Sequence, residues 1–306
     1  MSEYRENAAR KLVEKTSHLK LVEKNTAEAP KVFSHNAAPL QADWKKILPD
    51  LSTFGELKFT IANPAVSLSH KSSLNNVIDW NQVYLLAGEN MQQGCLTSVW
   101  SKAAIVKSCE DSLHDSLRIM SSRGEEILRL DLTEQSNCIG FASPLIKQWS
   151  KKGHPQSVPD KWRLYRELHM LDELSRENEQ EFSNHWYNMA SSSAKGRDVN
   201  VSLLIPLFEA LVDQYCRFRV FVGNKGILTR YDHAWFDFEH DGDQVKLWST
   251  NASLNINLGK VAIARVGNYI QLYDTSGDCV MSIELVDDAT SKEQSVWERL
   301  ILALIQ

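Results

Sequence analysis

The stretch "VFVGNKGILTRYD" at residues 220–232 places a glycine-framed turn between two short runs that are typical of β-strands. Glycine and asparagine permit the positive φ angles of tight turns, so this stretch predicts a β-hairpin. A related stretch, "FTIANPAVSLSH", occupies residues 59–70. The two align without a gap at an offset of 161 residues, which pairs Asn63 with Asn224 and His70 with Tyr231.

Two further blocks repeat in the same order along the chain. Residues 101–106 match residues 259–264, and residues 116–132 match residues 269–285 with their apolar alternation and turn glycine kept. Three ordered matches predict an internal duplication. We expect an α+β fold of two similar halves, each a largely antiparallel β-sheet with flanking helices.

The pattern along the chain predicts four segments and several helices. The segments are an N-terminal charged helix and tail at 1–40, a first sheet-and-helix half at 41–155, a helical linker and loop at 156–200, and a second half at 201–306. Helices that flank the sheets are expected at 43–51, 144–152, 207–215 and 295–305, a linker helix at 163–189 and a loop at 190–198.

Composition limits the classes of partner. The 306 residues are 43% apolar and include nine tryptophans, which is enough for a substantial core. With 34 basic and 39 acidic residues the net charge is -5, so we expect no binding to nucleic acid. The charged N-terminal residues lack the apolar run of a signal peptide, which predicts a cytoplasmic protein without membrane insertion.

Motifs that carry chemistry are missing from the sequence. The five cysteines form no C-x-x-C pair, which favours buried thiols over a zinc or redox site. The fingerprints of phosphate-binding loops, dinucleotide binding, nucleophile elbows and zinc proteases do not occur. We expect no catalytic constellation, and the sequence leaves open whether the protein is an enzyme.

Several of these segments resemble a known family. The turn "VFVGNKG" at 220–226, the hairpins at 116–137 and 269–278, and the closing "VWERL" at 296–300 are similar to bacterial cytoplasmic haem-utilisation proteins of the HemS/ChuS type. The likeness covers residues 41–306. It implies a duplicated sheet-and-helix fold that binds haem in the cytoplasm; some members pass haem to a haem oxygenase or break the macrocycle themselves.

The sequence departs from that family at three positions of the implied haem site. Ser193 stands where the resemblance implies the proximal histidine, and serine is not an ordinary haem-iron ligand. Gly94 stands where it implies a distal arginine. The segment "VDDATSKEQ" at 286–294 is acidic where the family has a basic segment that would face the haem propionates.

If haem is bound, the iron ligand must come from another position. Tyr231 and His70 can supply phenolate or imidazole, and Arg230 could steady a phenolate or meet a propionate. The alternative is that Tyr231 and His70 are edge-strand residues with their polar tips in water. His185 could replace the missing histidine, although the helix dipole alone also favours a histidine near a helix C-terminus.

The histidine- and aspartate-rich stretch "YDHAWFDFEHDGD" at 231–243 superficially resembles a metal site. Its alternation puts Trp235, Asp237 and Glu239 on one strand face, with Phe236 and Phe238 on the other. The "HDGD" sequence is typical of a hairpin turn, so a solvated strand and turn is favoured over a metal site.

The leading hypothesis is a cytoplasmic protein that binds or traffics haem or a related tetrapyrrole and passes it to a protein acceptor. One alternative is a divergent homologue that does not bind haem and acts as a protein-interaction or regulatory module. A further alternative is a haem-degrading enzyme, which needs an open iron position and a reductant.

Overall fold

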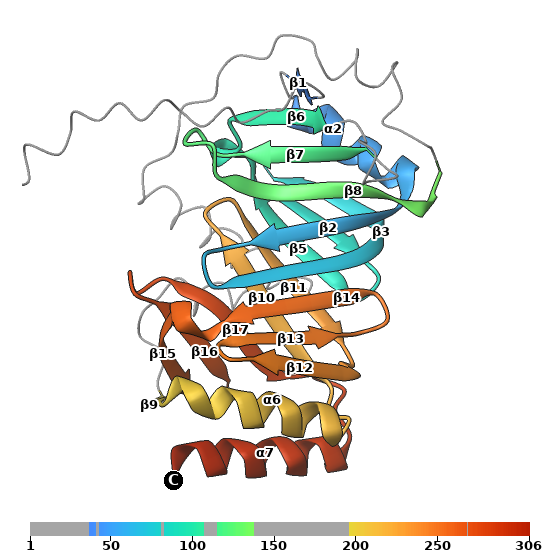
Figure 1. Ribbon diagram of the computed structural model, residues 1–306. Coiled ribbons are helices and arrows are strands. Elements are labelled where there is room, and N and C mark those ends of the chain that lie inside the picture. Colours follow the sequence, from blue (N-terminus) through green and yellow to red (C-terminus); the bar gives the residue numbers. More distant parts are fainter. Residues whose placement is uncertain (1–36, 41–42, 81–82, 107–114, 138–195, 268) are drawn as a thin grey trace, which may run out of the picture. The chain divides into compact units, whose positions relative to one another are not determined.

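A computed structural model gives the fold (Figure 1). It describes residues 37–40, 43–80, 83–106, 115–137, 196–267 and 269–306, which all belong to one compact unit. The helices predicted at 144–152 and 163–189 lie outside these residues. We call residues 37–137 the N-terminal part and residues 196–306 the C-terminal part.

The described elements are mainly strands. The N-terminal part contains β1 (Ala37–Leu40), α2 (Trp44–Leu51), β2 (Gly55–Ala62), β3 (Val66–Trp80), β4 (Val83–Gly88), β5 (Met91–Leu96), β6 (Lys102–Val106), β7 (Ser116–Met120) and β8 (Glu126–Ser136). The C-terminal part contains β9 (Arg197–Val199), α6 (Leu204–Asp213), β10 (Phe218–Asn224), β11 (Ile227–His233), β12 (Asp237–Asp241), β13 (Gln244–Trp248), β14 (Ala252–Asn257), β15 (Val261–Val266), β16 (Ile270–Asp274), β17 (Cys279–Leu285) and α7 (Ser291–Ile305).

The strands form two antiparallel sheets. The first sheet has the order β1-β6-β7-β8-β2-β3-β14-β13-β12. The second has the order β9-β15-β16-β17-β10-β11-β5-β4-β3. The long strand β3 contributes its first residues to one sheet and its last residues to the other, so it joins them.

Each sheet is completed by strands from the other part of the chain. The hairpins of β12, β13 and β14 belong to the C-terminal part but extend the first sheet by pairing β14 with β3. Conversely, β4 and β5 belong to the N-terminal part but extend the second sheet by pairing β5 with β11. Neither part therefore closes its sheet with its own strands alone.

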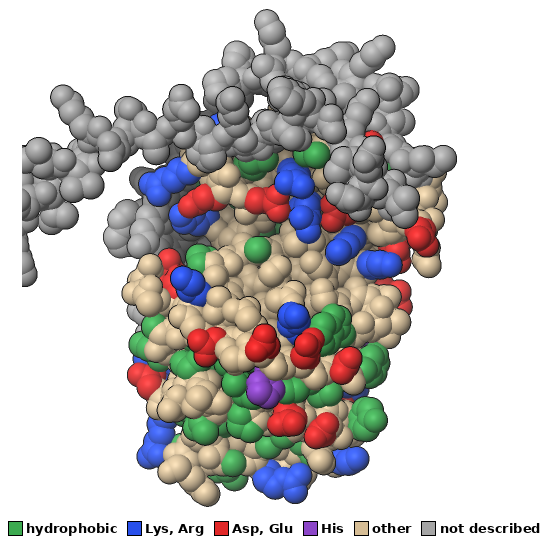
Figure 2. Space-filling model, viewed as in Figure 1, with side chains coloured by type: hydrophobic (Ala, Val, Ile, Leu, Met, Phe, Trp, Pro, Cys, Tyr) green, Lys and Arg blue, Asp and Glu red, His purple; other side chains and the backbone are tan. Residues whose placement is uncertain are grey.

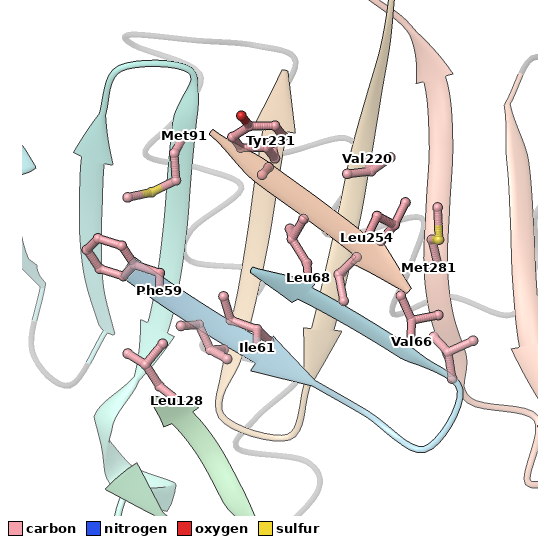
Figure 3. Close-up of a cluster of buried hydrophobic side chains, with 14 of the residues drawn as sticks. Phe59, Ile61, Val66, Leu68, Met91, Leu128, Val220, Tyr231, Leu254 and Met281 are labelled. Atoms are coloured by element: carbon pink, nitrogen blue, oxygen red, sulfur yellow. The ribbon is translucent and has the colours of Figure 1, made fainter. Parts of the chain in front are cut away.

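The main core lies between the two sheets. Strands of the second sheet pass behind those of the first in Figure 1, and β10 contacts β2 and β3. Most of the alternate residues that face the other sheet along these strands are apolar, as period-two alternation requires, and His70 of β3 is a buried polar exception. Figure 3 shows part of this cluster, which includes Phe59, Ile61, Leu68, Val220, Leu254 and Met281, all of them buried.

The helices lie at the two ends of the sheets. In the N-terminal part, Trp44 of α2 packs edge-on against Trp100, with ring centroids 4.9 Å apart. In the C-terminal part, α6 contacts β12 and α7, and α7 contacts β9, β15 and β17. None of the described helices is long and apolar enough to cross a membrane.

The hairpins predicted at 59–70, 116–132, 220–232 and 269–285 are confirmed. The helix predicted at 295–305 begins earlier, at Ser291, because Thr290 and Glu293 form a capping box whose polar residues hide the start of the helix. The prediction of a loop at 190–198 is wrong for its last two residues, because Arg197 and Asp198 belong to strand β9, which pairs with β15. The tail predicted at 1–40 ends in strand β1, which pairs with β6.

Candidate functional site

The β2–β3 and β10–β11 hairpins meet at their turns through reciprocal hydrogen bonds. The Nδ2 atoms of Asn63 and Asn224, paired by the offset of 161, each donate to two backbone carbonyls of the opposite part of the chain. The acceptors and distances are Gly223 at 2.9 Å and Val280 at 2.8 Å for Asn63, and Ala62 at 3.1 Å and Ile127 at 2.8 Å for Asn224. Each Oδ1 also accepts from its own turn, so both asparagines fix the turn and the contact between the parts.

His70 and Tyr231, the second pair related by that offset, stack on one another at the centre of the core. Their ring centroids lie 5.4 Å apart, and Phe59 stacks on the other face of His70 at 5.1 Å. Each side chain is only 1% exposed. The interpretation of both as edge-strand residues with tips in water is therefore wrong, because β3 and β11 are interior strands of the sheets.

Burial keeps both rings neutral. Desolvation lowers the pKa of His70 to about 3. Gln93 Nε2 lies 3.2 Å from His70 Nε2; with the amide donating, the histidine proton sits on Nδ1, which has no hydrogen-bond partner. Burial also raises the pKa of Tyr231, although its hydrogen bond with Ser249 lowers it in part. Neither group is poised as an anionic or freely accessible iron ligand.

The Tyr231 hydroxyl lies at the edge of the core and points away from the labelled apolar side chains in Figure 3. It is 3.3 Å from Ser249 Oγ, and Tyr231 lines a pocket of about 650 Å³. The other lining residues are almost all polar or charged: Gly55, Glu56, Lys71, Ser72, Ser73, Asn75, Glu89, Asn90, Gln135, Asn137 and Asn251. A haem macrocycle is apolar, so this wall does not suit it.

Arg230 lies on the opposite face of β11 from Tyr231, because successive strand residues point to opposite faces. Its guanidinium pairs with Asp232 at 2.8 Å and lies 3.7 Å from Asp287. The prediction that Arg230 steadies a Tyr231 phenolate is therefore wrong. Register places Arg230 beside Phe221 of β10 and on the same face as Leu228.

The neighbouring Arg219 is the centre of a buried ion-pair network. It is 3% exposed and contacts Asp232 at 3.1 Å, Glu284 at 3.0 Å and also Asp287. Burial opposes its charge, but the hydrogen bond from Arg219 to Asp287 and the charges of Asp232 and Glu284 outweigh burial and raise the pKa of Arg219. A buried guanidinium with several carboxylates is a structural ion-pair site.

The acidic segment 286–294 supplies partners for these arginines. Asp287 pairs with Arg219, while Asp288 and Glu293 pair with Arg217 at 3.1 and 2.8 Å. The hydrogen bond from Arg217 lowers the pKa of Glu293 to about 2 despite burial. The segment therefore neutralises the positive charges of Arg219 on β10 and of Arg217 just before β10, rather than presenting positive charge to a ligand.

The remaining expected site residues divide by whether the structure describes them. His185 and Ser193 lie outside the described residues. Gly94 lies on β5 opposite Leu228, on the same face of the second sheet as Arg230. Of the five cysteines, Cys95, Cys216 and Cys279 are described and are free thiols, with Cys95 and Cys216 buried as expected.

The stretch 231–243 is a strand, a loop and a hairpin. The predicted turn is confirmed, with Gly242 at φ +54° between β12 and β13. The predicted alternation fails at Trp235, which is 2% exposed, while Phe236 is exposed, because the chain leaves the sheet between β11 and β12. Within the described part of the chain, no group of three or more His, Cys, Asp or Glu residues is placed to hold a metal ion.

Comparison with known proteins identifies the fold. The structure matches apo-PhuS, a haem-binding protein from Pseudomonas aeruginosa, with a TM-score of 0.66 and 15% identity over 88% of this chain and 87% of that one. It matches ChuS, described as an Escherichia coli haem oxygenase, with a TM-score of 0.69 and 16% identity over 89% and 90%. The chain has the PhuS and ChuS fold. The predicted resemblance to HemS/ChuS-type proteins is thereby confirmed for the fold.

No protein-family model matches the sequence, and a search of curated proteins found no significant match. Within the PhuS and ChuS fold, the sequence analysis missed Gln93 beside His70 and the carboxylates around Arg219. The offset of 161 pairs Arg219 with Lys58 and could have directed attention to that position; no local pattern indicates Gln93.

Proposed function

We propose that the protein binds or traffics haem or a related tetrapyrrole. The observation that carries this proposal is the PhuS and ChuS fold over nearly nine-tenths of the chain, since those proteins are described as haem-binding and haem oxygenase proteins. Fold does not by itself determine function. The residues of this chain must therefore supply a surface suited to the ligand.

The face of the second sheet that carries Arg230 suits haem better than the polar pocket at Tyr231 does. Phe221 and Leu228 are apolar side chains of that face and do not belong to the core cluster between the sheets, although both are buried in the haem-free structure. Gly94, opposite Leu228, has no side chain and would let a flat ligand approach the backbone closely. Arg230 would meet a haem propionate on this face, in exchange for part of its pairing with Asp232.

His185 is the iron ligand that we favour among the residues proposed from the sequence. Tyr231 and His70 are the other two, but their rings stack on one another in the core between the sheets. Imidazole is the usual protein ligand of haem iron. Phe221, Leu228, Arg230 and His185 are thus the proposed contacts.

Titration of the full-length protein with hemin tests the proposal. We expect a saturable, stoichiometric Soret shift that His185→Ala abolishes and Arg230→Gln weakens about fivefold to tenfold, as loss of one charge-assisted hydrogen bond would. The matched controls Tyr231→Phe and His70→Phe should leave the shift unchanged. Absence of any saturable shift in the wild-type protein would refute haem binding, and loss of the shift in Tyr231→Phe would refute this choice of site.

A protein-interaction module without haem is the second candidate function. The observation that favours it is that Arg219 of β10 and Arg230 of β11 are already paired with acids, which leaves them less free for propionates. This function predicts no Soret shift and a stable protein partner in pull-downs. Haem degradation is a further alternative, tested by release of iron or carbon monoxide from the haem complex with ascorbate.

We also propose that the chain arose by internal duplication, with halves at 41–155 and 201–306 and a linker at 156–200. The common strand order of the two sheets and the reciprocal bonds of Asn63 and Asn224 support it. The cytoplasm is the proposed location, and a protein acceptor of haem is the proposed partner. Fractionation of cells that produce the protein tests the location.

A further inference from the structure

The two central hairpins carry different charges at equivalent positions of their outer faces. The offset of 161 pairs Lys58 with Arg219 and Lys71 with Asp232. In the β10–β11 hairpin, Arg219 and Asp232 are opposite one another and form an ion pair at 3.1 Å. In the β2–β3 hairpin, Lys58 is directly opposite Lys71, so two like charges occupy the same two positions.

Like charges directly opposite on neighbouring strands destabilise a sheet. The acid nearest in register is Asp131, which lies opposite Lys58 on β8 but is paired with Arg129 at 3.3 Å. Asp131 thus faces one side of Lys58, and Lys71 has Asn251 rather than an acid on its other side. Glu56, two residues from Lys58 on the same face of β2, and Glu89 line the larger pocket that Lys71 also lines. Acids thus lie on that side of the lysine pair, and the side toward β14 has none among the lining residues of a smaller pocket there.

A pocket of about 190 Å³ lies at this lysine pair. Apart from Lys58 and Lys71, its lining consists of Ser69, His70, Ser249, Thr250, Asn251, Ala252 and Ser253, so no carboxylate lines it. In Figure 2, basic side chains lie within the surface over β2, β3 and β14, whereas acidic side chains gather over β12 and β13. The pocket thus combines two ammonium groups with hydroxyl and amide donors.

We propose that this pocket binds a small oxyanion of the phosphate class between Lys58 and Lys71. In the β10–β11 hairpin the carboxylate of Asp232 neutralises Arg219. The β2–β3 hairpin has Lys71 at the equivalent position, so a bound anion would take the place of that carboxylate and offset the repulsion between the two ammonium groups. Thr250 and Ser253 supply hydroxyl donors, and a dianion near neutral pH matches two lysines better than a monoanion does. The site lies on the first sheet and needs neither haem nor His185.

Isothermal titration calorimetry of the full-length, haem-free protein with inorganic phosphate at constant ionic strength tests the proposal. We expect saturable binding to one site. Lys58→Gln and Lys71→Gln should each raise the Kd at least tenfold. Lys102→Gln is the matched control, an exposed lysine of β6 in the same sheet but outside the pocket lining, and should change the Kd less than twofold.

Two further titrants define the class of ligand. Glycerol 3-phosphate binding as tightly as inorganic phosphate, or more tightly, would support a phosphate ester as the ligand. Acetate binding as tightly as phosphate would overturn the phosphate class. No saturable heat with phosphate, or an equal loss of binding in Lys102→Gln, would overturn the site itself. None of these outcomes depends on whether hemin binds, so the haem proposal stands or falls separately.

Discussion

The β2–β3 and β10–β11 hairpins occupy equivalent places in the two sheets and make the same contacts through their turn asparagines, yet their outer faces differ. The β10–β11 hairpin places a buried arginine opposite an aspartate, with two further acids around it. The β2–β3 hairpin places two lysines opposite one another beside a small pocket. The inner faces, by contrast, join in one core at the His70–Tyr231 stack.

The difference separates what holds the fold together from what is free for a ligand. Both hairpins have the same register and the same turn asparagine, because each turn must hydrogen-bond to the other part of the chain. The charged residues on the outer faces take no part in that contact, so their charges can differ between the two hairpins. In one hairpin they are neutralised within the protein, and in the other they are left for an external partner.

The largest expected effect comes from removing the cation at the two equivalent positions. Arg219→Met should lower the free energy of unfolding by about 3–5 kcal/mol, because three carboxylates lose a buried partner. Lys58→Met should change it by no more than about 0.5 kcal/mol, as for most surface substitutions. Urea denaturation measures both, and similar costs at the two positions would remove the distinction between the hairpins.

Replacement of the turn asparagines tests what the hairpins share. Asn63→Ala and Asn224→Ala should each cost about 2 kcal/mol, because each leaves two carbonyls without their donor. Thermal and urea unfolding should give costs that agree within about 1 kcal/mol. A large cost at one asparagine and none at the other would contradict equivalent roles for the two turns.

The pH dependence of stability tests the centre of the core. Burial lowers the pKa of His70 to about 3 from the usual 6.5, so between these values the unfolded chain binds a proton that the folded chain does not. His70 therefore adds a loss of stability as the pH falls from 6.5 toward 3, of up to about 1.4 kcal/mol per pH unit. In His70→Phe this contribution should disappear from urea unfolding between about pH 4 and pH 6. An unchanged slope would mean that His70 takes up a proton in the folded state.

Local signals in the sequence were enough to predict the hairpins and their equivalence. Asn224 and Gly226 mark the turn, and period-two alternation marks the strands on each side. The offset derived from that turn predicted the pairs Asn63 with Asn224 and His70 with Tyr231. In the structure His70 stacks on Tyr231, and each asparagine bonds to the residue that precedes the other. Turn chemistry and alternation depend on neighbouring residues, so they can be read without knowing the fold.

Partners distant along the chain could not be predicted in this way. The pairing of β14 with β3 and of β5 with β11 buries both strands inside a sheet, and this is why Tyr231 and His70 are core residues rather than edge residues. Both pairings join strands that are far apart in the sequence, so local periodicity does not encode them.

The charge difference between the hairpins is tested most directly by one substitution, Lys71→Asp, which gives the β2–β3 hairpin the charge pair of its counterpart. In phosphate-free buffer the variant should melt about 1–3 °C above the wild-type protein, since a repulsive pair becomes an attractive one. Added phosphate should raise the melting temperature of the wild-type protein but not that of the variant. A variant that melts below the wild-type protein without phosphate, or that keeps the phosphate-dependent rise, would contradict the account.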